Sequence, residues 1–397
     1  MITTLAWHTE EPDAENPMAL LDDLEVDAVG ELSTGSWDIR HTNEEGVEIK
    51  GPLDEHARIN LNTITKLQLE EFDRMGLDVI DAISDWIDED DEVQDLGAES
   101  NFYDGRDMGY GPRNENFKTI AELELVAGAF AEYVRGEDWN MNNRLDPNEN
   151  DEYDSIPPDN GDGLLNGGWA SLLTTRSRTT AMSMSGFPRI DLRDTTPEDL
   201  IETLDVDQLQ AEALIQWGQS EGASLSALLT VELGELVGGG SSNNSNQSRS
   251  TGRSSRSSRQ AQQDVVQPLS QDQLKAVFAE CTLDDFGGPQ PIPGQININT
   301  AGPEVLRIIF AGDTAIADAI ITLRQSRSEG IQSIVDLMDI RRIPSEELAG
   351  VANMLDVTSQ VFSVTCRGTA STGQEVEIFA VLDRSTLPVT IVEYREN

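Results

Sequence analysis

The sequence predicts an α+β protein in which both chain ends build a small antiparallel sheet and a large helical insertion lies between them. Three observations lead to this prediction. Apolar and polar residues alternate near both termini, one short pattern occurs three times in the middle, and a stretch rich in glycine, serine and arginine separates two of its copies. With 397 residues, the chain is long enough for two or three domains.

The first expected element is a β-hairpin near the N-terminus. Residues 37–40 and 47–49 alternate between apolar and polar side chains, and a turn with Asn43 and Gly46 lies between them. Residues 361–366, 376–382 and 389–394 predict three more strands near the C-terminus. We infer that the strands of the two ends pair with one another, although the pattern alone does not prove it.

An internal repeat organises the middle of the sequence. Residues 59–63, 190–194 and 296–300 read INLNT, IDLRD and ININT, and a helix-start signal follows each of them. The apolar spacing after each start predicts two helices of about ten residues joined as a tight hairpin. The start signals are a Thr65–Gln68 capping box, Thr196 before Pro197, and Gly302 before Pro303.

Residues 238–263 predict a flexible tether, because they are glycine, serine, asparagine, glutamine and arginine with scarcely an apolar residue. The four arginines of this stretch form the only basic patch in the sequence. No aromatic residues are interleaved to stack on nucleic-acid bases, so a tether is favoured over an RNA-binding segment.

The overall charge balance is strongly acidic. Lys and Arg number 27 against 73 Asp and Glu, which gives a formal net charge of −46. Such a chain repels nucleic-acid phosphates and anionic membrane surfaces, and it attracts divalent cations or basic partners. No apolar run is long enough for a membrane span, and no signal peptide is found.

The cysteines and histidines give no metal signature. Cys281 and Cys366 lie 85 residues apart, a spacing that matches no zinc or thioredoxin-like motif, and the three histidines are scattered. Whether the two cysteines form a disulfide or stay as free thiols is left open by the sequence.

Residues 58–126 carry a family resemblance. The order is RINLNT, then AISDWIDED at 82–90, then GAE at 97–99, followed by Tyr103, PRN at 112–114, Phe117 and ELELV at 122–126. This order and spacing resemble general secretion pathway protein K, a minor pseudopilin of type II secretion systems. The resemblance resumes at 296–301 and in the C-terminal strands, whereas residues 136–268 depart from the pattern.

The resemblance implies a structural protein of the pseudopilus tip with a pilin-like sheet, a helical insertion and calcium. It implies other minor pseudopilins as partners, and neither nucleic acid nor a small-molecule substrate. It also implies a periplasmic location and an inner-membrane anchor in the full-length form, which this sequence lacks. The expected parts are 1–58 and 356–397 (pilin-like), 59–135, 187–237 and 269–355 (helix-hairpin-helix or SAM-like repeats), 136–186 (calcium loops) and 238–268 (linker).

Residues 138–149 form the clearest chemical motif, a calcium-loop pattern. Side-chain oxygens fall at positions 1, 3, 5, 9 and 12 of the template, and Arg144 at position 7 would supply its backbone carbonyl with its side chain turned away. Asn143 replaces the usual glycine and tolerates a left-handed backbone. A helix over about 119–134 is expected before the loop. The alternative is an acidic turn without metal. The predicted ligands are Asp138, Asn140, Asn142, Arg144, Asp146 and Glu149.

Two weaker sites are also predicted. Asn160, Asp162 and Asn166 belong to a degenerate second loop, which either binds a cation with help from Asp151 or Asp154 or forms only a turn. A third group is supported by the family resemblance more than by spacing, and it consists of Asp85, Asp88, Asp90 and Glu99.

Two other classes of function were weighed against the structural role. The repeated hairpins resemble those of DNA-uptake proteins, but their turns lack the Gly-x-Gly signature, two carry acids, and the chain is strongly negative. The second class is an enzyme with paired carboxylates. With 73 acids such pairs occur by chance, and the sequence shows neither a set of nucleophile and base nor a phosphate loop. We therefore expect no catalysis.

Overall fold

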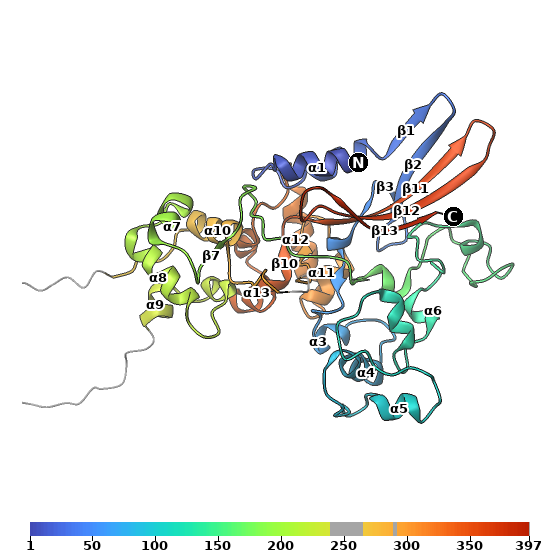
Figure 1. Cartoon of the computed structure of the whole chain (residues 1–397), viewed down its shortest axis with the longest axis horizontal. Coiled ribbons are helices and arrows are strands. Elements are labelled where there is room, and N and C mark those ends of the chain that lie inside the picture. The colour runs from blue at the N-terminus through green and yellow to red at the C-terminus, as the bar shows by residue number, and fades with distance from the viewer. Residues whose placement is uncertain (239–264, 289–291, 397) are drawn as a thin grey trace, which may run out of the picture.

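Strands from the two ends of the chain form one antiparallel sheet, as we inferred from the alternating pattern. The computed structural model describes residues 1–238, 265–288 and 292–396, so most of the predicted tether lies outside the described residues. The sheet order is β1-β2-β11-β12-β13, with β3 added to β2 and β4 added to β11 (Figure 1). Its strands are β1 Val29–Leu32, β2 Gly35–Thr42, β3 Glu48–Lys50, β4 Leu53–Asp54, β11 Val361–Ala370, β12 Glu375–Asp383 and β13 Thr390–Glu396.

The predicted N-terminal hairpin is confirmed. Strands β2 and β3 pair with His41 opposite Ile49, and the Asn43 amide donates to the carbonyl of Val47 at 3.0 Å. Gly46 has a φ of +77°, a conformation that glycine adopts without strain. Strand β2 also pairs with β11, with Ile39 opposite Cys366, and this pairing joins the two ends of the chain.

Two helices that the sequence did not predict cover one face of the sheet. Helices α1 Ile2–Glu10 and α2 Ala19–Val26 place Leu5 and Leu24 against Phe362 and Val364, and these side chains are almost fully buried. Within the described residues, no helix has the length and apolar character needed to cross a membrane.

The insertion consists of three copies of one arrangement. Each copy begins with a two-residue strand, continues through short helices on both sides of a 3₁₀ turn, and ends with a strand parallel to the first. Figure 1 shows the third copy next to the sheet, with the second copy beyond it and the first copy below. The assignment of these copies to the helix-hairpin-helix or SAM-like class stays a prediction.

The elements of each copy have the following bounds. The first contains β5 Ile59–Asn60, α3 Lys66–Leu69, α4 Leu77–Ile87, α5 Ser100–Asp104, a 3₁₀ turn Ile120–Leu125, α6 Ala131–Val134 and β6 Leu173–Thr174. The second contains β7 Ile190–Asp191, α7 Pro197–Leu204, α8 Gln208–Gly218, a 3₁₀ turn Leu225–Leu229, α9 Leu233–Gly238, α10 Gln271–Glu280 and β8 Cys281–Thr282. The third contains β9 Ile296–Asn297, α11 Pro303–Ile309, α12 Thr314–Gln325, a 3₁₀ turn Ile334–Asp339, α13 Ser345–Val351 and β10 Leu355–Asp356.

The repeated INxNT pattern has a structural explanation. Asn60 and Asn297 each accept, through Oδ1, the amide N–H of the residue two positions later, which ends the strand. The second asparagine then bridges to the segment before the 3₁₀ turn. Asn299 accepts from the amide of Ile331 at 2.8 Å and donates to its carbonyl at 2.9 Å, and Asn62 does the same with Phe117.

Two helix predictions were wrong in length. The helix that starts at the confirmed Thr65–Gln68 capping box is a single turn, Lys66–Leu69, rather than about ten residues. The predicted helix over 119–134 is a 3₁₀ turn and the short α6, separated by Gly128 at a φ of +83°. A left-handed residue cannot continue a right-handed helix, so the chain turns at this glycine.

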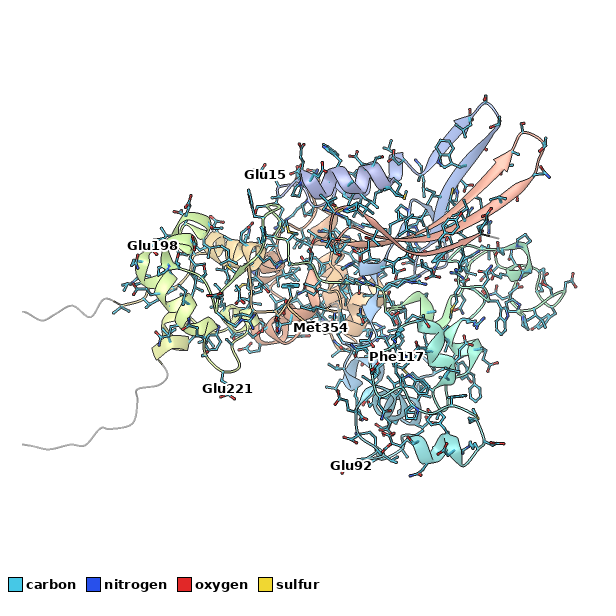
Figure 2. The ribbon with its side chains drawn as sticks, in the orientation of Figure 1. Glu15, Glu92, Phe117, Glu198, Glu221 and Met354 are labelled. Atoms are coloured by element: carbon cyan, nitrogen blue, oxygen red, sulfur yellow. The ribbon has the colours of Figure 1, made fainter. Side chains whose placement is uncertain are left out.

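A buried charged segment joins the sheet to the repeats. Asp54 accepts hydrogen bonds from Thr300 of the third copy and from Ser359, between β10 and β11, both at 2.6 Å. The adjacent Glu55 accepts from Thr174 of the first copy and contacts the hydroxyl of Ser363 on β11. Most other acids face outwards, as Figure 2 shows for Glu15, Glu92, Glu198 and Glu221, which are all exposed.

Candidate cation sites

The predicted calcium loop, residues 138–149, follows α6 and has the turn geometry that its sequence suggests. The Asp138 carboxylate accepts the amides of Asn142 and Asn143 at 3.0 Å, and Asn140 accepts the amide of Asn142 at 2.9 Å. Asn143 has a φ of +58°, so the expected left-handed conformation at this position is confirmed. Alternate residues therefore turn their side-chain oxygens towards the inside of the loop.

The end of the loop is closed by Glu149, which is 1% exposed. Its two oxygens accept the amides of Trp139 and Asp146, each at 3.0 Å. Burial, together with the nearby Asp138 and Asp146 carboxylates, raises the pKa of Glu149 to about 7. Burial likewise raises the pKa of Asp138 to about 6. These carboxylates are costly to ionise without a cation.

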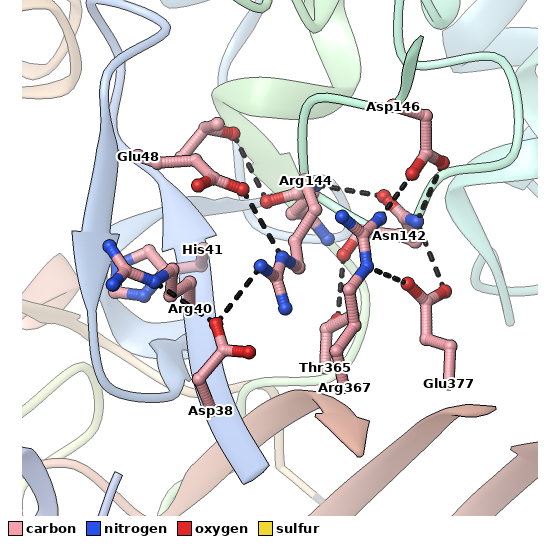
Figure 3. A network of polar contacts seen from close by, with 12 residues as sticks. Asp38, Arg40, His41, Glu48, Asn142, Arg144, Asp146, Thr365, Arg367 and Glu377 are labelled. Atoms are coloured by element: carbon pink, nitrogen blue, oxygen red, sulfur yellow. Dashed lines mark hydrogen bonds and ion pairs between the residues drawn. The ribbon is translucent and has the colours of Figure 1, made fainter. Parts of the chain in front are cut away.

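Side chains of the sheet hold this loop in place (Figure 3). Arg144 points away from the loop, as expected, and donates to Asp38 at 3.1 Å and to Glu48 at 3.2 Å. Arg367 of β11 lies between Asp146 of the loop and Glu377 of β12, with 2.8 Å to Glu377. No local signal predicts these contacts with β11 and β12, because they join positions more than 200 residues apart.

The second loop also forms turns of this kind. Asn160, Asp162 and Asn166 each accept an amide N–H from two residues later, at 2.9, 2.8 and 3.1 Å. Gly163 has a φ of +80°, and Leu165 is 3% exposed, as their positions in the loop template require.

Glu137 reaches this loop, although the sequence did not single it out. It accepts the amide of Asn166 at 3.0 Å. Burial, the dominant cause, and the nearby Asp159 and Asp162 carboxylates raise its pKa. Asp151, which the sequence suggested as an additional cation ligand of this loop, instead accepts the hydroxyl of Ser155 at 2.7 Å.

The third group is the most compact cluster of possible metal ligands in the described part of the chain. Carboxylate oxygens of Asp85, Asp88 and Glu99 all lie within 4.8 Å of one another at the C-terminal end of α4. Among these three side chains, both Glu99 oxygens and Oδ1 of Asp88 are buried without a hydrogen-bond partner. Three acceptors that are buried and unsatisfied in one place are unusual in a folded protein.

The local sequence explains how this cluster forms. Asp85 is fully buried and accepts the amide of Gln94 at 3.1 Å. A side chain at Gly97 would place its Cβ 2.0 Å from the Asp85 carboxylate, so only glycine fits there. Burial, followed by the Asp85 and Asp88 charges, raises the pKa of Glu99 to about 7.

Two further residues complete the description of this cluster. Asp90, which was predicted with it, is exposed and accepts the amide of Glu92 at 2.8 Å, so its carboxylate lies outside the group. The Oδ1 atom of Asn114 is buried without a hydrogen-bond partner. The backbone N–H of Asn114 donates to the carbonyl of Trp86, which lies on α4 next to Asp85, at 3.0 Å. Asn114 belongs to the PRN motif but was not named as a ligand.

The two cysteines do not pair. Cys281 is buried in β8, and Cys366 is half-buried in β11, and both are free. Burial raises the pKa of both thiols, that of Cys281 to about 12. Both therefore stay protonated and unreactive at neutral pH.

Comparison with known proteins supports the family resemblance. Residues 57–136 match the family model of the type II secretion system (T2SS) protein K, so the resemblance predicted from the sequence is confirmed over this segment. This segment contains the whole Asp85–Asp88–Glu99 cluster. No curated protein sequence matches the chain significantly.

One similar solved structure is a chain of the GspK-GspI-GspJ complex from the type 2 secretion system of enterotoxigenic Escherichia coli. The alignment covers 93% of this chain and 82% of the other, at 13% sequence identity and a TM-score of 0.40. A likeness at this level carries no argument about partners or sites.

Proposed function

We propose that this chain is a minor pseudopilin of a type II secretion system, resembling protein K, and that it has a structural rather than an enzymatic role. The match of residues 57–136 to the protein K family carries this proposal. The architecture supports it, because one sheet made from both chain ends encloses a long helical insertion, as the resemblance implies. In this role the chain supports protein export across the outer membrane.

The partners that fit this role are other minor pseudopilins of the same secretion system. The full-length form would lie in the periplasm, anchored in the inner membrane, and would join them near the tip of the pseudopilus. The acidic charge of −46 disfavours the alternative of DNA binding, because duplex DNA repels such a surface.

Calcium binding within the insertion is the second part of the proposal. The carrying observation is the pair of Glu99 oxygens, buried without a partner and within 4.8 Å of Asp85 and Asp88 oxygens. Carboxylates and amide oxygens are the ligands that calcium prefers, and Asn114 adds an amide oxygen nearby. When bound, the ion would supply positive charge that lets these acids ionise together.

The 138–149 loop is proposed as a second calcium site. Its oxygens repeat on alternate residues, and burial raises the pKa values of Asp138 and Glu149, so a bound cation would favour their ionised forms. Here Arg367 contacts Asp146, so a cation at this loop would share that carboxylate with the arginine. Through Arg367 and Glu377 the loop is tied to the sheet, and ordering the loop would stiffen that junction.

Co-purification tests the secretion role. The chain, with its native anchor, is expressed together with the two other minor pseudopilins of the same gene cluster and isolated through a tag on one of them. We expect a complex that contains all three proteins in equal amounts. If the chain is folded but binds neither pseudopilin, and instead binds duplex DNA in a salt-sensitive way, the proposal is wrong.

A further inference from the structure

A cavity of about 380 Å³ lies where the β2–β3 hairpin, the segment after β4 and the third repeat meet. Two arginines line it, Arg58 from the start of the first repeat and Arg324 from α12. Neither belongs to the cation sites described above. Within the residues that the structure describes, no carboxylate oxygen lies within 4.0 Å of either guanidinium, unlike Arg144, Arg176 and Arg307, which each contact two carboxylates.

Arg58 is buried, with 7% of its surface exposed, yet it makes a single side-chain hydrogen bond, to Oδ1 of Asn143 at 2.5 Å. A guanidinium carries five N–H donors, so most of them remain available to the cavity. The carboxylates of Glu55, Asp138 and Glu44 act on Arg58 from a distance, but none forms an ion pair with it, so the cost of burying this cation is only partly offset.

Arg324 is placed in the same way from the opposite wall. Its Nη1 donates to the backbone carbonyls of Ile298 at 3.2 Å and Ala301 at 2.8 Å. These two bonds fix the orientation of the guanidinium, while its other nitrogens have no protein acceptor in the described chain. Two oriented cations therefore face one cavity.

The one acid whose charge acts on both arginines, Glu44, is held by other groups. Glu44 lines the cavity, but its carboxylate accepts the amides of Glu304 at 2.8 Å and Val305 at 3.2 Å at the start of α11. Gly302 makes room for it, because a Cβ there would lie 2.2 Å from the carboxyl carbon of Glu44. Glu44 thus lowers the positive potential of the cavity without contacting either guanidinium.

We propose that this cavity binds a small oxyanion, either a free carboxylate or an inorganic phosphate, through the guanidinium groups of Arg58 and Arg324. The planar donor pairs of arginine match the oxygens of both groups. Binding would bring a negative charge into direct contact with both guanidinium groups, and it would link the segment before the first repeat to the third repeat through one ligand. This inference does not depend on the proposed secretion role or on calcium.

Isothermal titration calorimetry of the intact chain with sodium acetate and with sodium phosphate, at constant ionic strength, tests the proposal. We expect saturable binding of at least one anion at one site per chain, and the anion that binds more tightly identifies the source. Arg324→Gln should weaken that binding by about tenfold or more, because one charge-assisted contact is lost. The matched control is Arg341→Gln, which removes an exposed arginine of equal charge that does not line the cavity and should leave the affinity unchanged.

A second variant keeps the test independent of Arg324. Glu44→Gln, measured at pH 8 because burial raises the pKa of Glu44 to about 7, removes the negative charge near both arginines and should strengthen anion binding severalfold, provided circular dichroism shows native folding. Absence of saturable binding for both anions would overturn the proposal. So would equal weakening by Arg324→Gln and Arg341→Gln, because the effect would then reflect net charge alone, or an unchanged affinity in Glu44→Gln.

Discussion

Whether Glu99→Gln is more or less stable than the wild type should depend on calcium, with opposite orders of stability in chelator and in calcium. Without calcium, three carboxylates lie within 4.8 Å of one another, and glutamine removes one charge while it offers N–H donors to Asp85 and Asp88. The variant should then be as stable as the wild type or more stable. With calcium, the variant lacks one anionic ligand and should be the less stable protein.

The magnitude follows from the distances in the cluster. At 4.8 Å, two full negative charges repel one another by about 3.5 kcal/mol when the effective dielectric constant is about 20. A cation bound only by the folded chain, at a hundredfold excess over its Kd, adds about 2.7 kcal/mol to the free energy of unfolding. For an unfolding unit of 150–250 residues this corresponds to a rise in Tm of roughly 5–11 °C.

Differential scanning calorimetry at pH 8 measures the Tm of wild type and variant, each in calcium and in chelator. The matched control is Asp104→Asn, which removes one exposed negative charge from the neighbouring α5 and should keep the full calcium-dependent rise. If Glu99→Gln shows the same rise in Tm as the wild type, calcium does not bind at this cluster. If the wild type shows no rise at all, neither proposed calcium site is correct.

Three further predictions concern pH, the second site and the repeats. In chelator, the free energy of unfolding should fall as pH rises from about 4.5 to 7. The folded pKa values of Glu99 and Glu149 are both about 7, above their ordinary value of 4.5, so the folded state binds more protons than the unfolded state in this interval. Calcium should flatten the Tm–pH curve, and a chelated protein that gains stability over this interval would contradict the reasoning. Glu149→Ala removes the acceptor of the Trp139 and Asp146 amides and should cost about 0.5–1.5 kcal/mol in chelator for each hydrogen bond lost. It should also reduce the calcium-dependent rise in Tm, whereas an unchanged rise would make the loop an acidic turn. Asn299→Ala removes the acceptor of the Ile331 amide and should lower the free energy of unfolding, measured in urea, by about 1–3 kcal/mol. The control is Asn116→Ala at an exposed position, which should change this free energy by less than about 0.5 kcal/mol. Equal effects would show that the motif has no structural role.

Much of the fold could be predicted because its signals are local. The hairpin around Asn43 and Gly46 and the capping box at Thr65 depend on neighbouring residues, and both are present in the structure. The repeated pattern identified all three copies, since Asn60, Asp191 and Asn297 each accept the amide N–H of the residue two positions later. The pairing of the two chain ends was inferred from the alternation alone, and the β2–β11 ladder confirms it.

Other parts could not be predicted because they depend on distant partners. Helices α1 and α2 have weak apolar patterns and are held by burial against β11, more than 300 residues away. The predicted helix over 119–134 is interrupted at Gly128, whose left-handed backbone the apolar spacing does not reveal. The buried contacts of Asp54 and Glu55 join three separate parts of the chain and have no local signal.

The candidate cation sites show the same division. Spacing predicted the turns of the 138–149 loop and the left-handed Asn143, because an oxygen at every second residue has a local geometric meaning. It did not predict Arg367, which reaches Asp146 from β11. In the third cluster the resemblance selected Asp85, Asp88 and Glu99, whereas Asn114 needed the structure, since an unsatisfied buried oxygen is visible only after folding.

Export by the type II pathway is the measurement that tests the central claim most directly. A strain that lacks this gene should retain its secreted enzymes in the periplasm, and the wild-type gene should restore their appearance in the medium. The account predicts that loss of the protein lowers export while the amounts of the secreted enzymes inside the cell do not fall. Normal export in the deletion strain, with the other minor pseudopilins at ordinary levels, would contradict it.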